Sequence, residues 1–122
     1  MKVLVAWSRT VREDQAPQIH YYLDEMQPRI TKVVHGGASG ADSIGGHWAK
    51  INLLPVSRID ADWEQYGKAA GPIRNQRMLD DHPDIEMVLA FVDKPINQSR
   101  DTLDMVRRAI EAEIDYEVVR LK

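Results

Sequence analysis

A glycine-rich segment in the first half of the chain carries the clearest chemical signal. Residues 33–42 read VVHGGASGAD, so two β-branched residues run directly into three closely spaced glycines. Because glycine loses more conformational freedom on folding than other residues, this density indicates either a tight turn or a loop whose backbone N–H groups bind an anion at a helix start. The spacing matches neither GxGxxG nor the P-loop lysine motif, so it indicates neither a nicotinamide cofactor nor ATP hydrolysis. We predict anion or nucleotide binding through Gly36, Gly37, Ser39, Gly40 and Asp42.

Two arginines lie close together in the stretch ADWEQYGKAAGPIRNQRM, residues 61–78. Gly71 and Pro72 suit the N-cap and the first position of a helix, which places Arg74 in the first turn and Arg77 one turn further on the same face. A cation there opposes the helix dipole by about 0.3–1 kcal/mol when exposed, so the pair favours an anion bound between them. The alternative is pairing with nearby carboxylates, namely Glu64, Asp80 or Asp81.

Aromatic and acidic side chains surround these arginines. Trp63 and Tyr66 could stack on a nucleobase, although aromatic residues in such loops more often fill the core. Asp60 and Asp62 are candidates for binding sugar hydroxyls or for acid–base chemistry, while solvated loop carboxylates are the commoner outcome. Asp42 poses a similar choice, since it could cap the helix after the glycine loop or bind ribose hydroxyls.

Polar residues also follow two apolar runs elsewhere in the chain. Ser8 and Arg9 come after KVLVAW, where a guanidinium could bind phosphate through two hydrogen bonds; taken alone, the pair is more typical of a surface turn. Thr102 lies at the start of the last predicted helix. Asp101 and Asp104, three residues apart, are typical of a helix-capping arrangement there.

Composition excludes several other kinds of site. The chain has 122 residues, no cysteine and a formal net charge of −3, which rules out disulfides and thiolate metal sites and argues against nucleic acid as a partner. The four histidines form no metal-binding spacing. The apolar run at the N-terminus is too short for a signal peptide or a membrane span. We predict a cytoplasmic protein with one domain over residues 1–122, no metal, no cofactor and no membrane partner.

The elements that must position these residues alternate between strand and helix patterns. Apolar runs rich in β-branched residues predict strands over 2–7, 31–35, 55–60, 85–92 and 116–121, the third of them near an edge. Helical spacing predicts helices within 14–29, from residue 41, after Pro72 and around 103–110. The second and last helices carry apolar stripes formed by Ile44, Trp48 and Ile51 and by Leu103, Val106 and Ile110. Gly45 and Gly46 weaken the second helix, which indicates close packing or close approach of a ligand.

Strands that alternate with helices predict an α/β fold with a mainly parallel five-stranded sheet, the first strand central and helices on both faces. Ligands of such sheets bind at the carboxyl ends of the strands. We therefore expect the loops after Trp7, His35, Asp60 and Val92 to meet. The residues expected to line one cleft are Ser8, Gly37, Gly40, Arg74 and Asn75.

Four fragments resemble the YspA/YpsA-related branch of the SLOG superfamily. They are SR at 8–9, GGASGAD at 36–42, ADWEQYGKAAGPIRNQRML at 61–79 and DTLDMVRRA at 101–109. The resemblance covers nearly the whole chain and implies a single Rossmann-like domain with a nucleotide or nucleotide-derived, ADP-ribose-like ligand at its glycine loops. SLOG relatives include Lonely-guy phosphoribohydrolases and the DNA-processing protein DprA. The resemblance also implies a possible homodimer, because relatives often pair through helices.

The resemblance assigns ligand-binding positions residue by residue. The matching residues are Ser8, Arg9, Gly36, Gly37, Gly40, Ala41, Asp42, Asp62, Trp63, Gly67, Gly71, Arg74, Asn75 and Thr102. The chain departs from the family at Trp7, where many relatives carry glycine. It departs again at Gln98–Asp101, where relatives have a GGxGT-like sequence ending in the threonine. Asp104 matches the acidic residue of the phosphoribohydrolases only loosely, and these departures argue against hydrolysis.

The leading hypothesis is therefore a module that binds a small nucleotide-type molecule. Arg9, the glycine loop and Arg74 would hold phosphate, and an aromatic side chain would face the base: Trp7, Trp63 or Tyr66. One alternative is hydrolysis of an N-glycosidic bond in a nucleoside phosphate, with Arg74 and Asp104 or Asp62 as the catalytic residues. Another is a nucleic-acid-associated protein similar to DprA, against which the acidic net charge counts.

Overall fold

The computed structural model describes residues 1–36 and 44–122 as an α/β fold built on a parallel sheet. The strands of the sheet are β1 (Lys2–Trp7), β2 (Lys32–His35), β3 (Val56–Arg58), β4 (Ile85–Val92) and β5 (Asp115–Arg120). Within the described residues these five strands follow the order β3-β2-β1-β4-β5, and every neighbouring pair is parallel. The predicted parallel sheet with the first strand at its centre is confirmed.

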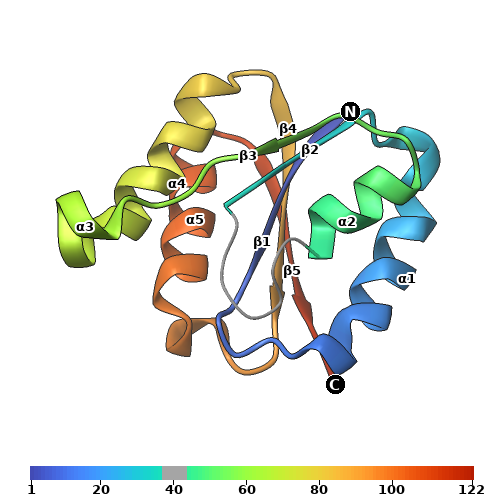
Figure 1. Ribbon diagram of the computed structural model, residues 1–122, viewed down its shortest axis with the longest axis horizontal. Helices are drawn as coiled ribbons and strands as arrows, with labels where there is room; N and C mark the ends of the chain where they lie inside the picture. The colour runs from blue at the N-terminus through green and yellow to red at the C-terminus, as the bar shows by residue number, and fades with distance from the viewer. Residues whose placement is uncertain (37–43) are drawn as a thin grey trace.

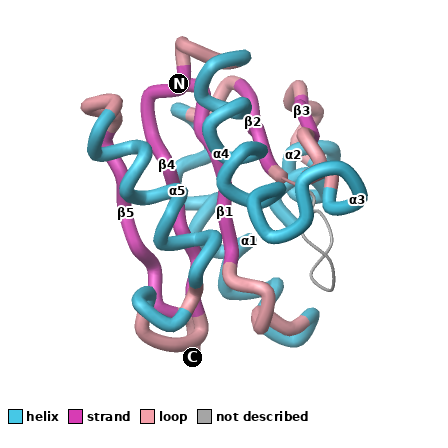
Figure 2. The backbone as a smooth tube through the Cα atoms, turned by 90° about the vertical axis from the view of Figure 1, so that its left-hand side faces the viewer, coloured by secondary structure: helices cyan, strands magenta, loops and turns pink. Residues whose placement is uncertain are grey.

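Helices cover both faces of the sheet (Figure 1). On one face lie α1 (Ala16–Met26) and α2 (Ile44–Ile51); on the other lie α4 (Ala70–Asp81) and α5 (Arg100–Glu111). The short helix α3 (Trp63–Tyr66) projects beside α4, which Figure 2 shows from a second direction. Short 3-10 turns flank these helices: η1 (Glu13–Gln15), η2 (Gln27–Arg29), η3 (Gly67–Ala69) and η4 (Ile96–Gln98).

The central strand explains why both faces need covering. Successive side chains of a strand point to opposite faces, and β1 is apolar at every interior position. Val3 and Val5 pack in the core beneath α1 and α2, whereas Leu4 packs in the core beneath α4 and α5. All three side chains are fully or almost fully buried. The continuous apolar run therefore produces two hydrophobic layers, one on each side of the sheet.

The two glycines inside α2 allow that helix to lie directly on the sheet. A Cβ at Gly45 would stand 3.2 Å from the Val5 side chain, and a Cβ at Gly46 would stand 2.6 Å from His35 Nε2. The close packing expected from the sequence at these positions is confirmed. The apolar stripes were only partly right, because Ile51 and Ile110 are 62% and 52% exposed.

Several predicted boundaries of helices and strands are wrong. Helix α4 begins at Ala70 with Ala69 as its N-cap, so Gly71 and Pro72 lie inside its first turn. One reason is that η3 continues directly into α4. The other is that Gly71 has no Cβ, which leaves space for the Asp101 carboxylate: a Cβ added at Gly71 would lie 2.7 Å from Asp101 Oδ1. β3 is also shorter than predicted, with three residues.

The predicted capping role of Asp101 and Asp104 is wrong as well. Helix α5 begins at Arg100, its N-cap is Ser99, and no side chain caps it. Asp101 instead accepts a hydrogen bond from Arg9. Asp104 accepts hydrogen bonds from Asn75 on α4 and Arg108 on α5. Among the helices of residues 1–36 and 44–122, none combines the length and the apolar composition needed to cross a bilayer.

Candidate functional site

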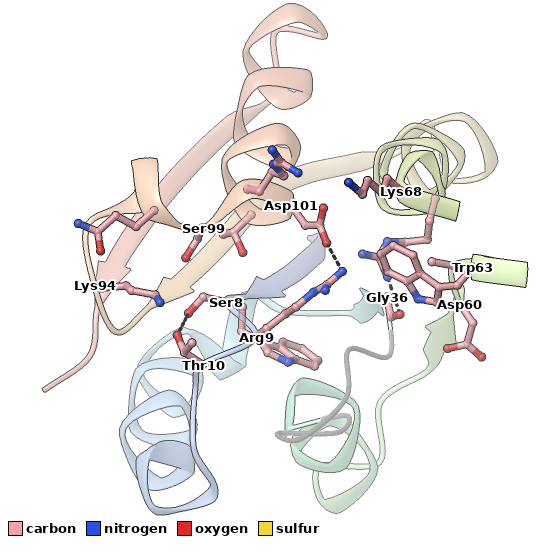
Figure 3. Close-up of a pocket in the computed structure, with 16 residues that line it drawn as sticks. Ser8, Arg9, Thr10, Gly36, Asp60, Trp63, Lys68, Lys94, Ser99 and Asp101 are labelled. Atoms are coloured by element: carbon pink, nitrogen blue, oxygen red, sulfur yellow. Dashed lines mark hydrogen bonds and ion pairs between the residues drawn. The ribbon is translucent and has the colours of Figure 1, made fainter. Parts of the chain in front are cut away.

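A cavity of about 750 Å³ opens at the carboxyl edge of the sheet (Figure 3). Each part of its wall follows a different parallel strand, as the topology requires. The described lining residues are Trp7 at the end of β1, Ser8, Arg9 and Thr10 after it, Gly36 after β2, Asp60, Ala61, Trp63, Lys68 and Arg74 after β3, and Lys94, Gln98, Ser99, Arg100, Asp101 and Thr102 after β4. Segments far apart in the sequence thus form one concave surface.

The cavity is more positively charged than the protein that contains it. Five of its described lining residues are cationic and two are carboxylates: Arg9, Lys68, Arg74, Lys94 and Arg100 against Asp60 and Asp101. The whole chain has a formal net charge of −3. A cleft lined by one sign of charge between low-dielectric walls concentrates counter-ions. The cavity is therefore suited to an anionic ligand.

Arg74 lies at the base of this cavity with neutral hydrogen-bond partners. Its Nη1 donates to the Gly36 carbonyl at 2.8 Å, and its Nε donates to Asn75 Oδ1 at 3.0 Å. Burial lowers the pKa of Arg74 and nearby Arg9 lowers it further, although Asp101 opposes these effects. A cation removed from water gains most from a charged hydrogen-bond partner, and Arg74 has none among the described residues.

Gly36 is required where Arg74 crosses the end of β2. A Cβ at Gly36 would overlap the Arg74 guanidinium, so a larger residue there would displace the Arg74 side chain from its present position. A smaller cavity of about 30 Å³ lies beneath the main one, lined in part by Gly36, Arg74, Asn75 and Thr102. Arg74 therefore lines both cavities.

Arg9 extends across the main cavity between two other elements (Figure 3). Its Nη2 lies 2.8 Å from Asp101 Oδ2 on α5, and its Cζ lies 4.8 Å from the ring centre of Trp63 on α3. Its side chain is 61% exposed, so water reaches the guanidinium despite both contacts. Arg9 therefore connects the β1 loop with two helices and can change partners at little cost.

The Ser8 hydroxyl is held by a neighbouring carboxylate. Ser8 Oγ donates to Asp93 Oδ1 at 3.1 Å, and Thr10 Oγ1 donates to the same atom. Burial alone would raise the pKa of Asp93, but the hydrogen bonds from Thr10 and Ser8 outweigh it and hold that pKa below its usual range. Because Asp93 takes the hydroxyl hydrogen, Ser8 offers the cavity an acceptor rather than a donor.

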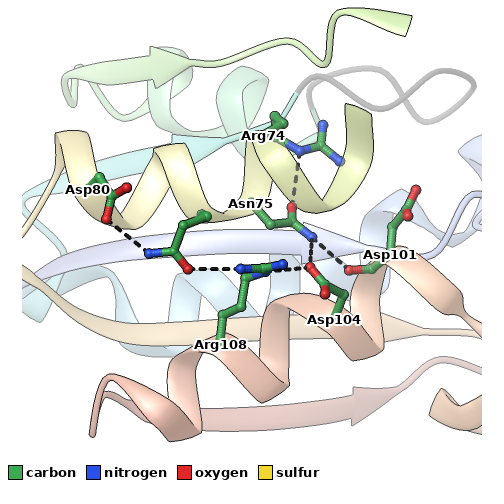
Figure 4. Close-up of polar contacts among 7 residues, drawn as sticks. Arg74, Asn75, Asp80, Asp101, Asp104 and Arg108 are labelled. Carbon is green, nitrogen blue, oxygen red and sulfur yellow. Dashed lines mark hydrogen bonds and ion pairs between the residues drawn. The ribbon is translucent and has the colours of Figure 1, made fainter. Parts of the chain in front are cut away.

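Asn75 and Asp104 belong to a network between α4 and α5 (Figure 4). Asn75 is 2% exposed, and its Nδ2 donates to the Asp101 carbonyl at 3.0 Å and to Asp104 Oδ2 at 3.1 Å. Arg108 Nε donates to the same Asp104 oxygen at 2.8 Å, and Arg108 Nη1 donates to Gln76 Oε1. Asp104 lines neither cavity.

The structure therefore brings together only some of the residues predicted from the sequence. Ser8, Arg9, Gly36, Trp63, Arg74 and Thr102 line the main cavity, and Asn75 lines the smaller one. Asp62 lines neither; its carboxylate accepts from Gln65 N at 3.1 Å and caps α3. Gly71 makes room for Asp101. Gly37, Ser39, Gly40 and Asp42 lie outside the described residues. Arg77, predicted to share an anion with Arg74 or to pair with a carboxylate, pairs with Asp81.

The sequence-based list missed several lining residues. Thr10, Lys68, Lys94 and Gln98 were not chosen as candidates, yet all four border the main cavity. Their position in the chain is the signal that identifies them, because each lies in a segment that follows a predicted parallel strand. Choosing by motif instead of by loop left them out.

Trp7 and Ser99 are buried beside the cavity with unpaired polar atoms. Within the described part of the chain, Trp7 Nε1 and Ser99 Oγ have no hydrogen-bond partner. Trp7 is 5% exposed and stacks on His35 with ring centres 5.8 Å apart. Trp7 also lines the main cavity.

A parallel α/β sheet with a cationic cavity at its carboxyl edge defines the general class, and the comparison with known proteins gives the family. The chain belongs to the YspA, cpYpsA-related SLOG family, whose model matches residues 1–66. The resemblance seen in the motifs is thus confirmed. The chain is also similar to the Gene 61 protein of Mycobacterium phage D29, with 37% identity over 121 residues that cover 93% of this chain and 91% of that protein.

Proposed function

We propose that the protein binds a small nucleotide-type ligand in the cationic cavity at the carboxyl edge of the sheet. The observation that carries the proposal is Arg74, a largely buried guanidinium with neutral partners in a cavity that holds four further cations. A phosphate on the ligand supplies the missing anionic partner. Membership of the SLOG family supports a nucleotide-related ligand.

Binding without turnover is favoured over hydrolysis. Cleavage of an N-glycosidic bond needs an acidic group beside the anomeric carbon or the attacking water. The two candidates for that role lie outside the cavity: Asp104 accepts from Asn75 and Arg108, and Asp62 caps α3. Side chains of Gln98, Ser99 and Asp101 also fill positions where close approach of backbone to a sugar phosphate was expected to need glycine.

The formal net charge of −3 supports a small molecule rather than a nucleic acid as the ligand. Nucleic-acid binding depends on many phosphate contacts spread over a basic surface. Here five of the cations line one cavity of about 750 Å³, a volume within the range of small-molecule sites. We therefore propose a single mononucleotide or a nucleotide derivative as the occupant.

The test compares two arginines of the same helix. Isothermal titration calorimetry with AMP and ADP would be performed on the wild type, Arg74→Ala and Arg77→Ala. We expect Arg74→Ala to weaken binding at least tenfold, because it removes a charge-assisted hydrogen bond worth about 1.5–3 kcal/mol. Arg77→Ala should bind as the wild type does, since Arg77 pairs with Asp81 at the surface.

Two results would contradict the proposal. One is a wild-type protein that binds none of a panel of AMP, GMP, CMP, UMP, ADP, NAD and ADP-ribose. The other is steady release of free base from any of these compounds, measured by chromatography, together with loss of that release in Asp104→Asn. This result would favour the hydrolase. A binding ligand at a hundredfold excess over Kd stabilises the fold by about 2.7 kcal/mol, so thermal denaturation gives an independent measurement.

A further inference from the structure

We infer that Trp63 is the stacking platform for the base of the ligand and that Arg9 covers this platform until a base displaces it. The inference rests on the proposed function and deepens it by naming the ligand class. The preferred ligand carries an aromatic base and a phosphate together. Phosphate compounds without a base, such as ribose 5-phosphate or pyrophosphate, should bind less tightly.

Trp63 is the aromatic residue that the geometry selects. Its side chain lines the main cavity and the residue is 46% exposed. Trp7 also lines the cavity, but it is 5% exposed and its ring already stacks on His35. Tyr66 lies on the same helix as Trp63 and is 43% exposed, yet it does not line the cavity. Trp48 is buried and donates to Asp24.

The Arg9 guanidinium occupies the place that a base would take. Arg9 and Trp63 both line the cavity, and Arg9 Cζ lies 4.8 Å from the ring centre of Trp63, so the covered face of the indole is the one turned toward the cavity. A planar cation and a planar base use the same ring face. Every nucleobase has a π-face, and its stacking energy on an indole generally exceeds that of an exposed cation–π contact.

When a base displaces Arg9 from Trp63, the phosphate of the same ligand becomes its new partner. Its other contact is an exposed ion pair with Asp101, which contributes little to stability. Arg9 and Arg74 repel one another, since Arg9 is one of the groups that lower the pKa of Arg74. A phosphate between the two guanidinium groups replaces repulsion by attraction. Base and phosphate binding are therefore coupled through one side chain.

Local structure sets the position of the Trp63 backbone at the start of α3. Asp62 caps α3 by accepting from Gln65 N, which makes Trp63 the first residue of that helix. Beyond the helix, Gly67 has φ of +56° with open space around it, a conformation that favours glycine. The chain thus turns from α3 into η3 and α4 while the Trp63 side chain remains directed to the cavity (Figure 3).

The experiment separates the base from the phosphate. Affinities for AMP, GMP, CMP, UMP, ribose 5-phosphate and pyrophosphate would be measured on the wild type, Trp63→Leu, Trp63→Phe and Tyr66→Leu. We expect Trp63→Leu to weaken binding of the mononucleotides about tenfold and to leave binding of pyrophosphate unchanged. Trp63→Phe should retain part of the affinity, and Tyr66→Leu all of it, because Tyr66 is an equally exposed aromatic residue outside the cavity.

Tryptophan fluorescence gives a second readout. A mononucleotide stacked on Trp63 should quench part of the emission in the wild type and in Tyr66→Leu but not in Trp63→Leu, while pyrophosphate should quench none of it. Trp63→Leu with wild-type affinity for every mononucleotide would overturn the inference, and loss of binding in Arg74→Ala would still uphold the proposed function. Absence of binding of all these probes to the wild type would overturn both.

Discussion

Asn75 shows how one buried amide holds the site and the fold together. It receives a hydrogen bond from Arg74 at the cavity and donates two to α5, while its own side chain is almost inaccessible to water. Each functional group of the amide is used. The position of Arg74 therefore depends on the packing of α4 against α5.

We predict that Asn75→Ala lowers the free energy of unfolding by about 1–3 kcal/mol, because it removes the buried amide that donates to the Asp101 carbonyl and to Asp104 and that accepts from Arg74. Urea denaturation followed by circular dichroism measures this change. Asn97→Ala is the matched control, since Asn97 is exposed in η4, and it should change stability by less than about 0.5 kcal/mol. Equal stability of the two variants would show that the network contributes nothing.

At the residue scale, the sequence predicted which loops form the site more accurately than it predicted the side-chain contacts within it. Arg74 was recognised because its position in a predicted first turn was electrostatically unusual. Its actual partners are Gly36, which follows β2, and Asn75, the next residue along α4, and no spacing rule predicts such a pair. Asp101 was mistaken for a cap because its partner Arg9 is 92 residues away.

At the scale of elements, helix α2 is fitted to the sheet through glycine. Gly46 faces the His35 ring, which is 2% exposed and stacked on Trp7. The His35 ring lies between α2 and Trp7, so a shift of this ring would also disturb Trp7, which lines the main cavity. Local helix preference and tertiary packing therefore make opposite demands on position 46.

We predict that packing decides the effect of Gly46→Ala. Alanine favours a helix by about 1 kcal/mol over glycine, but overpacking against His35 costs about 1–3 kcal/mol, so the melting temperature should fall. Lys50→Ala on the exposed face of α2 removes no packing contact and should leave the melting temperature almost unchanged. A more stable Gly46→Ala variant would mean that His35 repacks freely.

The elements that the sequence predicted most accurately are the ones with the simplest pattern. β1 and β4 begin and end where predicted, because an uninterrupted apolar run has obvious limits. The start of α4 was missed because α3 and η3 are too short to show helical periodicity, and they carry the chain into α4 without a clear break. These three consecutive elements, α3, η3 and α4, supply Trp63, Lys68 and Arg74 to the cavity wall.

At the scale of the whole molecule, cationic side chains lie at both edges of the sheet. The carboxyl edge holds the cavity, whereas Lys2 and Lys32 begin β1 and β2 at the opposite edge, near His82 at the end of α4. Burial lowers the pKa of His82 below its ordinary value of 6.5, and Lys32 and Lys2 lower it further. Protonation of His82 is therefore disfavoured in the folded protein.

We predict that the folded state loses stability as pH falls through 6.5. The unfolded chain, with the higher His82 pKa, takes up the proton first, so the unfolding free energy decreases until pH drops below the folded pKa and then stops responding to His82. Urea denaturation at pH 7.5 and at pH values down to 5 would show this decrease. His82→Gln should flatten it, and an unchanged pH dependence in that variant would contradict the prediction.

The position of β1 between β2 and β4 has a consequence for synthesis on the ribosome. Lys2 pairs with Ile85 across the sheet, so β1 waits for its second neighbour until the chain has grown by more than 80 residues, roughly 4–17 s at usual rates of translation. During that interval one edge of an apolar strand remains open to pairing with other chains. A nascent chain stalled before β4 should consequently aggregate or recruit chaperones, even though most of the helices around β1 have already been made.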